Sequence, residues 1–346
     1  MPNETETAHT EPEPSLDAKV RFLRSPESHP DLKQPPDCVE THMSWVFFVG
    51  DRVLKLKKPV RFPFLDFSTL QAREFYCREE LRLNSRLSPG IYLGLLALQA
   101  SDGGLALVPE ERLPAPGKTV DWLVLMRRLP PERMLQRLIT EARVEPRAID
   151  ALVAVLAAFY RRAPKVAVTP QEYLARFQRG QAANREVLLR PQFHLRDAAP
   201  ALDRFDAALL DRAALLGERA TRGSVVDGHG DLRPEHVCML EPPVVIDCLE
   251  FNAPLRQVDP FDEIAFLALE CEMAGAPWIG PRLLSGCAAA LHDLPCQALM
   301  QLFTAYRALM RARLAMAHLL DPVPRTPQQW PPRAQRYVER ALLALD

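Results

Sequence analysis

Several features are missing from this sequence of 346 residues. No apolar run approaches the roughly 18 residues of a membrane-spanning helix, and the acidic N-terminus has neither the basic nor the apolar region of a signal peptide. The formal net charge is only -1, which gives no general attraction to nucleic acid or to anionic membranes. We therefore expect a cytoplasmic protein whose partners include neither nucleic acid nor a membrane.

Paired cysteines and a phosphate-binding P-loop are also missing. The seven cysteines are odd in number, scattered and set among apolar residues, without a Cys-x-x-Cys pair, so we expect reduced thiols that fill the core. The pattern Gly-x-x-x-x-Gly-Lys-Ser/Thr is absent, which excludes a P-loop ATPase by motif. The remaining composition, 48% apolar and 25% charged, is that of an ordinary enzyme long enough for two lobes.

The most informative stretch is residues 225–252. Two short apolar runs around a Glu-Pro-Pro turn have the pattern of a β-hairpin. The runs are Val237 to Leu240 and Val244 to Ile246. A polar loop, His229 to His236, leads into this hairpin and Asp247 follows it. Because a tight turn brings the outer ends of antiparallel strands together, Asp231 and His236 should lie near Asp247.

This cluster has three interpretations on residue types alone. Two carboxylates suit phosphoryl transfer, in which Asp231 accepts a hydroxyl proton and Asp247 holds magnesium. Alternatively, His229, Asp231 and His236 could be ligands of a transition metal in a hydrolase. In the third interpretation these side chains only cap turns and hydrogen-bond the loop backbone.

The run His-Gly-Asp-Leu-Arg-Pro-Glu-His, residues 229–236, is followed by Val-Ile-Asp247 and by Asp-Pro-Phe-Asp262. Together these motifs closely resemble the aminoglycoside phosphotransferase family, which shares a protein-kinase-like fold with choline kinase. The family's usual loop reads His-Gly-Asp-Leu-His-Pro-Gly-Asn. The resemblance therefore implies that Asp231 is the catalytic base and that His236 replaces a metal-binding asparagine, although imidazole is a softer ligand than magnesium prefers.

The resemblance, which spans roughly residues 39–320, implies further roles. Asp247 would bind Mg²⁺ beside His236, and ATP would be the phosphoryl donor to a small-molecule hydroxyl. Arg233 would stabilise the transferring charge or brace the loop. Asp262 would brace the catalytic loop, whereas Asp259, directly before Pro260, reads as a helix N-cap. Some bacterial relatives carry an additional P-loop domain, which we do not expect here.

A second hairpin is predicted at Ser44 to Leu56, with a Gly50-Asp51 turn. Lys55, which lies between two leucines on the second strand, resembles the lysine that holds the α- and β-phosphates in this family. Lys57 and Lys58 are alternatives. The preceding loop, residues 40–45, contains no glycine, so the hydroxyls of Thr41 and Ser44 would have to contact the phosphates instead.

A helix from Ser68 to about Leu87 begins with the capping box Ser-Thr-Leu-Gln. Glu79 shares its face with arginines, whereas Glu80 shares its face with apolar residues. A half-buried carboxylate needs a cation, and the family resemblance supports the same partner that proximity suggests, Lys55.

The remaining elements are predicted from hydrophobic periodicity and turn signals. Three more strands are expected at Ile91 to Leu98, Leu105 to Val108 and Val120 to Met126. Helices are expected at 147–162, 170–189, 199–221, 260–273, 281–291 and 296–320, followed by a last amphipathic helix. Met126 and Arg127 begin a hinge, residues 126–130, whose backbone would meet adenine.

We therefore predict an α+β, two-lobed protein-kinase-like fold and an ATP- and Mg²⁺-dependent small-molecule kinase. The predicted parts are a mostly disordered lead-in, a nucleotide-binding lobe, a helical catalytic lobe and a proline-rich segment with a terminal helix. Their bounds are 1–38, 39–126, 127–321 and 322–346. The alternatives are a nucleotide-binding pseudokinase, suggested by the glycine-free loop and His236, and a metal-dependent hydrolase. The phosphoryl acceptor and the oligomeric state cannot be read from the sequence.

Overall fold

The computed structural model describes residues 13–62 and 65–346, so the predicted disorder of the first twelve residues lies outside the described range. The chain divides into two compact units. Unit 1 extends to Leu129 and also includes Glu250–Asn252, and unit 2 consists of Pro130–Leu249 and Ala253–Asp346. Among the described residues, no helix combines the length and the apolar character that crossing a membrane would require.

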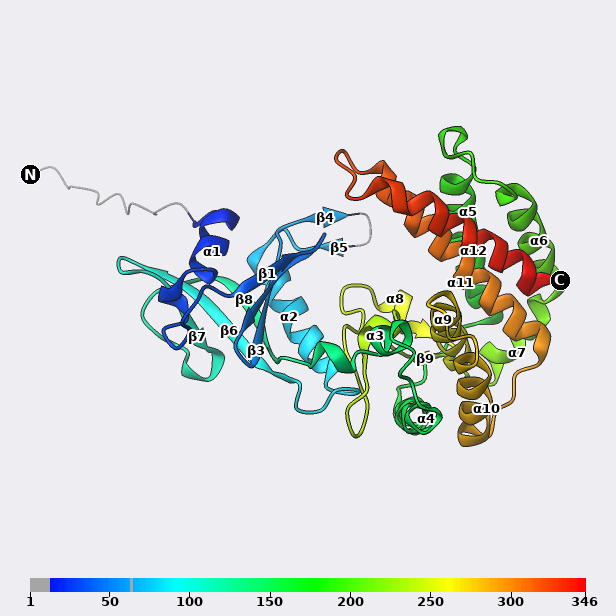
Figure 1. The fold of residues 1–346 in the computed structure, drawn as a ribbon, viewed down its shortest axis with the longest axis horizontal. Helices are drawn as coiled ribbons and strands as arrows, with labels where there is room; N and C mark the ends of the chain where they lie inside the picture. Colours follow the sequence, from blue (N-terminus) through cyan, green and yellow to red (C-terminus); the bar gives the residue numbers. More distant parts are fainter. Residues whose placement is uncertain (1–12, 63–64) are drawn as a thin grey trace, which may run out of the picture. The chain divides into compact units, whose positions relative to one another are not determined.

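Unit 1 is built on a six-stranded antiparallel sheet with the order β1-β2-β3-β8-β6-β7 (Figure 1). The strands are β1 (Asp37–Glu40), β2 (Ser44–Val49), β3 (Arg52–Lys57), β6 (Tyr92–Ser101), β7 (Gly104–Pro109) and β8 (Lys118–Arg127). A separate pair, β4 (Arg61–Phe62) and β5 (Leu65–Asp66), completes the unit's strands. The predicted hairpin at Ser44 to Leu56 is confirmed, including the Gly50 turn, where φ is +57°, and the three further predicted strands also form.

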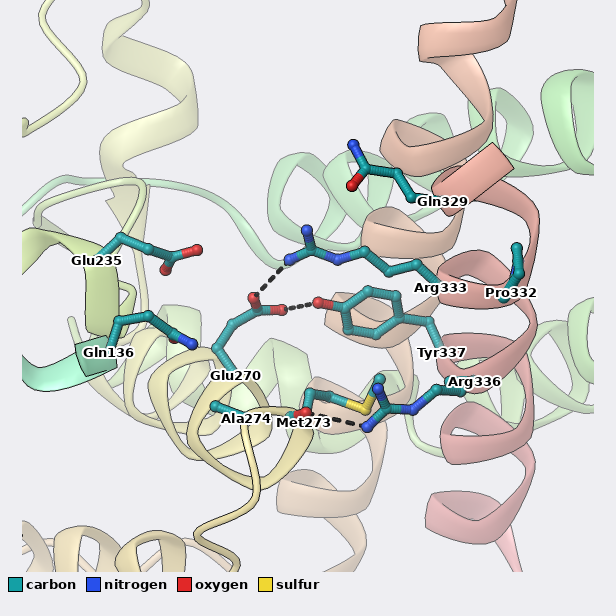
Figure 2. Close-up of a pocket in the computed structure, with 10 residues that line it drawn as sticks. All are labelled: Gln136, Glu235, Glu270, Met273, Ala274, Gln329, Pro332, Arg333, Arg336 and Tyr337. Atoms are coloured by element: carbon teal, nitrogen blue, oxygen red, sulfur yellow. Dashed lines mark hydrogen bonds and ion pairs between the residues drawn. The ribbon is translucent and has the colours of Figure 1, made fainter. Parts of the chain in front are cut away.

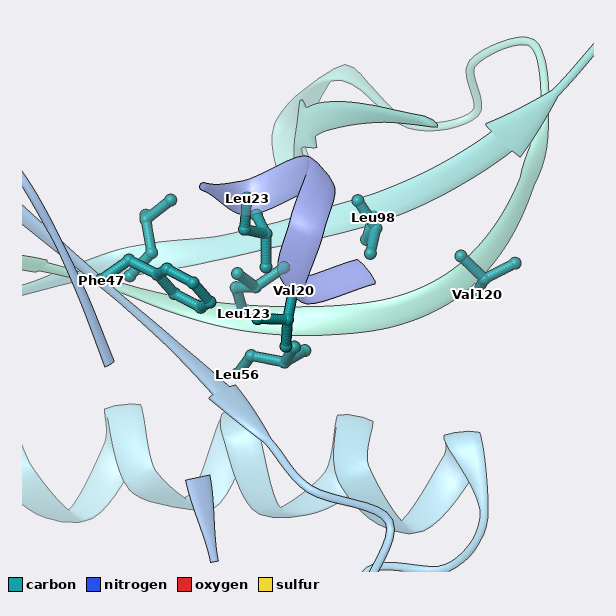
Figure 3. Close-up of a cluster of buried hydrophobic side chains, with 8 residues drawn as sticks. Val20, Leu23, Phe47, Leu56, Leu98, Val120 and Leu123 are labelled. Atoms are coloured by element: carbon teal, nitrogen blue, oxygen red, sulfur yellow. The ribbon is translucent and has the colours of Figure 1, made fainter. Parts of the chain in front are cut away.

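The first helix, α1 (Leu16–Leu23), covers one face of this sheet. Val20 and Leu23 pack there against Phe47, Leu54 and their neighbours (Figure 3). Lys19, on the same helix, donates to Asp121 at 2.7 Å and to the carbonyl of Val120 at 2.8 Å. This helix lies in the lead-in, residues 1–38, that was predicted to be mostly disordered, and its apolar face completes the core.

Helix α2 (Leu70–Asn84) covers the opposite face. Alternate strand residues point to opposite faces, so Leu54 and Leu56 face α1 whereas Lys55 and Lys57 face α2. The N-cap is Thr69, which accepts the N–H of Ala72 at 3.1 Å. The predicted capping box at Ser68 is therefore wrong by one residue, because the Ser68 hydroxyl donates to Asp66 instead.

Unit 2 is mainly helical (Figure 1). Its longer helices are α4 (Pro146–Arg162), α5 (Pro170–Leu188), α6 (Ala198–Asp211), α7 (Ala213–Thr221), α9 (Pro260–Met273), α10 (Ile279–Leu291), α11 (Gln297–Ala317) and α12 (Trp330–Leu345). Two short helices are α3 (Leu135–Thr140) and α8 (Ala253–Arg256), and the strands are β9 (Val226–Asp227), β10 (Val237–Cys238), β11 (Val244–Val245) and β12 (Gln257–Val258). The single helix predicted at 199–221 is wrong, because the chain leaves helical geometry at Arg212, where φ is -100° and ψ is 11°.

The terminal helix α12 is part of the core of unit 2. Its buried face carries Ala334, Tyr337, Val338 and Ala341, which include one fully buried aromatic ring. The small alanines allow close packing against neighbouring helices. We therefore do not separate the segment after Pro322 from the helical unit. Of the seven cysteines, Cys296 departs from the expected buried position and is exposed.

Candidate functional site

The predicted catalytic hairpin forms in unit 2. Strands β10 and β11 pair antiparallel, with Val237 opposite Val245, and the loop 229–236 enters the pair. The outer ends meet as expected: His236 Nδ1 lies 3.7 Å from a carboxylate oxygen of Asp231, and His236 Nε2 lies 3.5 Å from Asp247. The structure therefore brings Asp231, His236 and Asp247 into one cluster.

His229 is fully buried and held at both ring nitrogens. Its Nε2 lies 2.9 Å from the carbonyl of Ile246, and its Nδ1 accepts the N–H of Asp231 at 3.2 Å. These bonds require a neutral ring with the proton on Nε2. Burial lowers the pKa of His229 to about 4, further depressed by His236. Nε2 carries the proton, and the lone pair of Nδ1 accepts the N–H of Asp231, so neither nitrogen can bind a metal. His229 therefore positions the loop. The interpretation of His229, Asp231 and His236 as a metal triad is wrong.

His236 presents its second nitrogen to Asp247. The Nδ1 atom lies 2.8 Å from the carbonyl oxygen of Asp231, which fixes a proton on Nδ1. The Nε2 lone pair consequently faces Asp247 and also accepts a hydrogen bond from Arg233 at 3.2 Å. An orientation held by a backbone carbonyl is the arrangement typical of metal-ligating histidines.

Asp231 is held by Arg233 in a two-point ion pair. The guanidinium Nε and Nη2 each donate to a different carboxylate oxygen of Asp231 at 2.9 Å. Burial by itself would raise the pKa of Asp231, but His236 and Arg233 outweigh burial and lower it. Asp231 is consequently an ionised acceptor of hydrogen bonds at neutral pH.

Asp247 has a backbone conformation that is unusual outside glycine. Its φ is +61°, in the left-handed region, and its side chain is 48% exposed. Such conformations cost about 1–3 kcal/mol and persist where the surrounding structure enforces them. One exposed carboxylate next to an imidazole nitrogen is a donor set that fits a divalent cation, because magnesium commonly takes one or two protein carboxylates and completes its shell with phosphates and water.

The acid that braces the loop at 229–236 is Glu263. Its buried carboxylate accepts the N–H of His229 at 3.0 Å and the N–H of Gly230, and the hydroxyl of Tyr160 donates to it at 2.9 Å. The sequence assigned this bracing role to Asp262. That assignment is wrong by one residue, because Asp262 faces Arg307 on α11, with both bonds at 2.7 Å.

The start of α9 agrees with the sequence. Asp259 accepts the N–H of Phe261 at 2.9 Å and is the N-cap, with Pro260 as the first helical residue. Asp259 is also buried against Arg219, whose Nε lies 2.6 Å away. This buried pair fixes the helix that carries Glu263, the brace of the loop.

In unit 1, Lys55 meets Glu80 as predicted, at 2.8 Å. The same carboxylate also accepts from Lys57 at 2.6 Å, and Lys57 in turn pairs with Glu250. Lys57 and Glu80 are fully buried, whereas 15% of the Lys55 side chain is exposed. We call these four residues the lysine tetrad. Two lysines and two glutamates neutralise one another, and Lys55 is the most exposed member.

Lys57 and Glu250 are the members that sequence reasoning missed. Burial lowers the pKa of Lys57, but Glu250 and Glu80 more than compensate, so its pKa is raised overall. The signal for Lys57 was its spacing of two from Lys55, which places both on one face of a strand. For Glu250 we find no local signal, because its partner is 193 residues away in the sequence.

In the glycine-free loop, residues 40–45, the hydroxyl of Thr41 closes a turn onto Ser44. Thr41 Oγ1 accepts the N–H of Ser44 at 2.9 Å, and the hydroxyl lies 3.0 Å from the Ser44 carbonyl. Ser44 itself is buried, with 3% exposed. Contact of Thr41 and Ser44 with phosphates stays a prediction, and it would require this turn to rearrange.

Met126 and Arg127 lie at the end of β8. Met126 is opposite Val53 on one side and Tyr92 on the other. The N–H of Arg127 donates to the carbonyl of Ile91 at 2.8 Å, so it is already used within the sheet unit. The predicted adenine contact of Met126 and Arg127 stays a prediction, as does the hinge at 126–130.

Comparison with known proteins first identifies relatives by sequence. No protein-family model matches the sequence. Uncharacterized proteins of Mycobacterium tuberculosis (strain H37Rv) and Mycobacterium bovis are 33% identical over 304 residues, which is 83% of this chain and 56% of theirs. The chain is similar in sequence to these mycobacterial proteins, and it spans about half the length of the curated relatives it matches.

Solved structures with the same fold are small-molecule kinases by name. The choline kinase LicA of Streptococcus pneumoniae has a TM-score of 0.54 at 12% identity, covering 96% of this chain and 99% of that one. A choline kinase of Cryptosporidium parvum has a TM-score of 0.53 at 10% identity and covers 95% of both chains. A glucosamine kinase has a TM-score of 0.53 at 13% identity, covering 89% of this chain and 77% of that one.

The chain therefore has the two-lobed protein-kinase-like fold of the choline kinases. This result confirms, for the fold, the resemblance drawn from the motifs at 229–262. The antiparallel sheet with one helix on its lysine face is the small lobe, and the helical unit with the hairpin β10–β11 is the large lobe.

Proposed function

We propose that the protein transfers the γ-phosphoryl group of ATP to a hydroxyl of a small molecule, with Mg²⁺. The observation that carries the proposal is the cluster of Asp231, His236 and Asp247 at the open end of one hairpin. Support also comes from the structural neighbours, which are named as kinases of choline and of glucosamine.

The chemistry assigns one task to each residue. Asp231 accepts the proton of the substrate hydroxyl while that oxygen forms the new bond to the γ-phosphorus. The bond from this phosphorus to the β,γ-bridging oxygen breaks, and the products are ADP, a phosphate ester and a proton. Arg233, which is already hydrogen-bonded to Asp231, orients the carboxylate and adds positive charge.

The other polar groups would bind the nucleotide and the metal. When bound, Mg²⁺ neutralises charge on the phosphates. Asp247 would supply its carboxylate ligand, and His236 would supply Nε2. In unit 1, Lys55 would hold the nucleotide phosphates, while Glu80 and Lys57 fix its position.

The test is a screen for labelled-phosphate transfer from ATP and magnesium to a panel of hydroxyl metabolites, with Asp231→Asn as the matched control. We expect transfer by the wild-type protein and a fall in turnover of about 10²-fold or more in the variant, the usual scale for general acid–base catalysis. Equal turnover in both proteins would show that Asp231 is not the base.

A nucleotide-binding pseudokinase is the second candidate. Two observations favour it: Arg233 occupies both oxygens of Asp231, and Thr41 closes the loop that would cover the phosphates. A pseudokinase would bind ATP with magnesium in a thermal-shift titration and transfer no phosphate to any compound or to water. Transfer abolished by Asp231→Asn would exclude it.

A further inference from the structure

Unit 2 contains a cavity of about 440 Å³ next to the catalytic loop (Figure 2). Glu235 and Gln136 line one side, and Glu270 with the α12 residues Arg333 and Tyr337 lines the other. The volume is within the range of roughly 300–1,000 Å³ that small-molecule sites occupy.

The cavity is connected to the proposed base through one guanidinium group. Arg233 donates to Asp231 at 2.9 Å and lies 3.4 Å from Glu235, whose side chain forms part of the cavity wall. Asp231 and Glu235 therefore lie on two sides of the same planar group. The Arg233 guanidinium therefore lies between Asp231 and the Glu235 wall of the cavity.

Both acids of the cavity already face arginines. Arg311 pairs with Glu270 through bonds of 3.0 and 3.2 Å, and Tyr337 donates to Glu270 at 2.6 Å. Glu235 faces Arg233. A polycationic ligand would need carboxylates that are not neutralised in this way.

The cavity has polar groups with unmet hydrogen-bonding capacity. The Oε2 atom of Glu235 is inaccessible to solvent and has no hydrogen-bond partner among the described residues. Arg333 is 41% exposed, and its guanidinium is 3.9 Å from Glu270, beyond hydrogen-bonding distance. Arg336 adds a second positive charge to the lining. The wall can thus bind an anion at Arg333, and the Glu235 side chain, which is 38% exposed, offers its carboxylate to a hydrogen-bond donor.

We propose that this cavity binds the phosphoryl acceptor and that the acceptor is a small polyol or sugar carrying an anionic group. The inference rests on the proposed phosphotransferase function. Arg333 binds the anion, with Arg336 adding positive charge at the same wall. Glu235 accepts a hydroxyl or amine proton of the same molecule, which orients a second hydroxyl towards Asp231.

The test uses pairs of hydroxyl compounds that differ only in an anionic group. Glycerol is compared with glycerate and glycerol phosphate, and ribose with ribose 5-phosphate, while kanamycin serves as the polycation. We expect the wild-type full chain to prefer the anionic members in kcat/KM, and Arg333→Met to reduce that preference roughly 10- to 100-fold, the scale of one charge-assisted hydrogen bond. The comparison of the carboxylate and phosphate compounds identifies which anion is bound.

Arg340→Met is the matched control. Arg340 lies on the same helix but pairs with Glu272 at 2.8 Å and does not line the cavity. This variant should keep the wild-type preference, and the KM for ATP should be unchanged in both variants. A preference for neutral or cationic compounds, or an anion preference that survives in Arg333→Met, would overturn the inference while leaving the proposed kinase function intact.

A binding assay without ATP separates this inference from the proposed function. The melting temperature is measured with each anionic compound alone, for the wild type and for Arg333→Met. If the compounds stabilise only the wild type and no phosphate is ever transferred, the anion site stands and the kinase function fails. If no anionic compound reacts or raises the melting temperature, the cavity does not bind this class and the inference is wrong.

Discussion

Two charged clusters, one in each unit, differ in how completely their charges are compensated. In the lysine tetrad of unit 1, two lysines meet two glutamates, and Lys55 is the most exposed of the four side chains, at 15%. In unit 2, Asp231 and His236 are held in place, but Asp247 is 48% exposed in a left-handed backbone conformation. The charged groups of the tetrad are mostly buried, whereas the cluster in unit 2 exposes the carboxylate of Asp247 to solvent.

The largest expected effect is the loss of stability when the lysine tetrad is broken. Lys57→Met removes the cation that lies between the buried carboxylates of Glu80 and Glu250, while Lys55 still contacts Glu80. Removing one member of a buried ion pair typically costs about 3–5 kcal/mol. We expect a loss of this size in the free energy of unfolding, measured by urea denaturation.

Lys55→Met is the control for this prediction. Lys55 lies two residues from Lys57 on the same strand and contacts the same Glu80, but the side chain of Lys55 is partly exposed. It should lower ATP affinity while costing much less stability than Lys57→Met. Equal losses of stability in both variants would show that the two lysines have the same structural role.

The second effect is the pH dependence of stability that His229 causes. Its pKa is about 4 in the folded protein against an ordinary histidine value of 6.5, so between these two values the unfolded chain binds a proton that the folded chain does not. This contribution to stability is present above pH 6.5 and is lost as the pH falls towards 4, by about 3 kcal/mol in total.

His229→Gln checks this by urea denaturation across that pH range. A glutamine cannot be protonated, so the variant should be less stable at pH 7 but lose less stability on acidification than the wild type. Identical pH slopes in the two proteins would mean that acid unfolding is governed by other groups.

The third effect is on the affinity for magnesium. If His236 binds magnesium through Nε2, His236→Asn should remain active because the amide provides an oxygen ligand, whereas His236→Ala should lose roughly 10- to 100-fold in magnesium affinity. Wild-type activity and wild-type magnesium affinity in both variants would make His236 a bystander.

The sequence predicted elements whose signals are local. The hairpins β2–β3 and β10–β11 follow from alternating apolar runs and turn residues, and the start of α9 follows from Asp259 before Pro260. The pairing of Lys55 with Glu80 was also predictable, because helical spacing puts Glu80 on the apolar face of α2.

The parts that escaped prediction depend on contacts distant in sequence or on a shift of one residue. Glu250 joins the tetrad from far along the chain, so no local pattern could identify Lys57 as its buried partner. Asp262 and Glu263 are adjacent acids at the start of one helix, and only packing decides that Glu263 turns towards the loop. Neither proline nor glycine lies at the break between α6 and α7 at Arg212, so residue type does not predict it.

The most direct test of the account is calorimetric titration of ATP with and without magnesium into the wild type, Asp231→Asn and Asp247→Ala. The account predicts that Asp231→Asn keeps nearly full affinity, because that carboxylate acts on the acceptor. Asp247→Ala should lose the magnesium-dependent part of the affinity, because it removes the carboxylate ligand beside His236. Equal ATP affinity in wild type and Asp247→Ala, both with magnesium, would contradict the assignment of a metal–nucleotide site to this cluster.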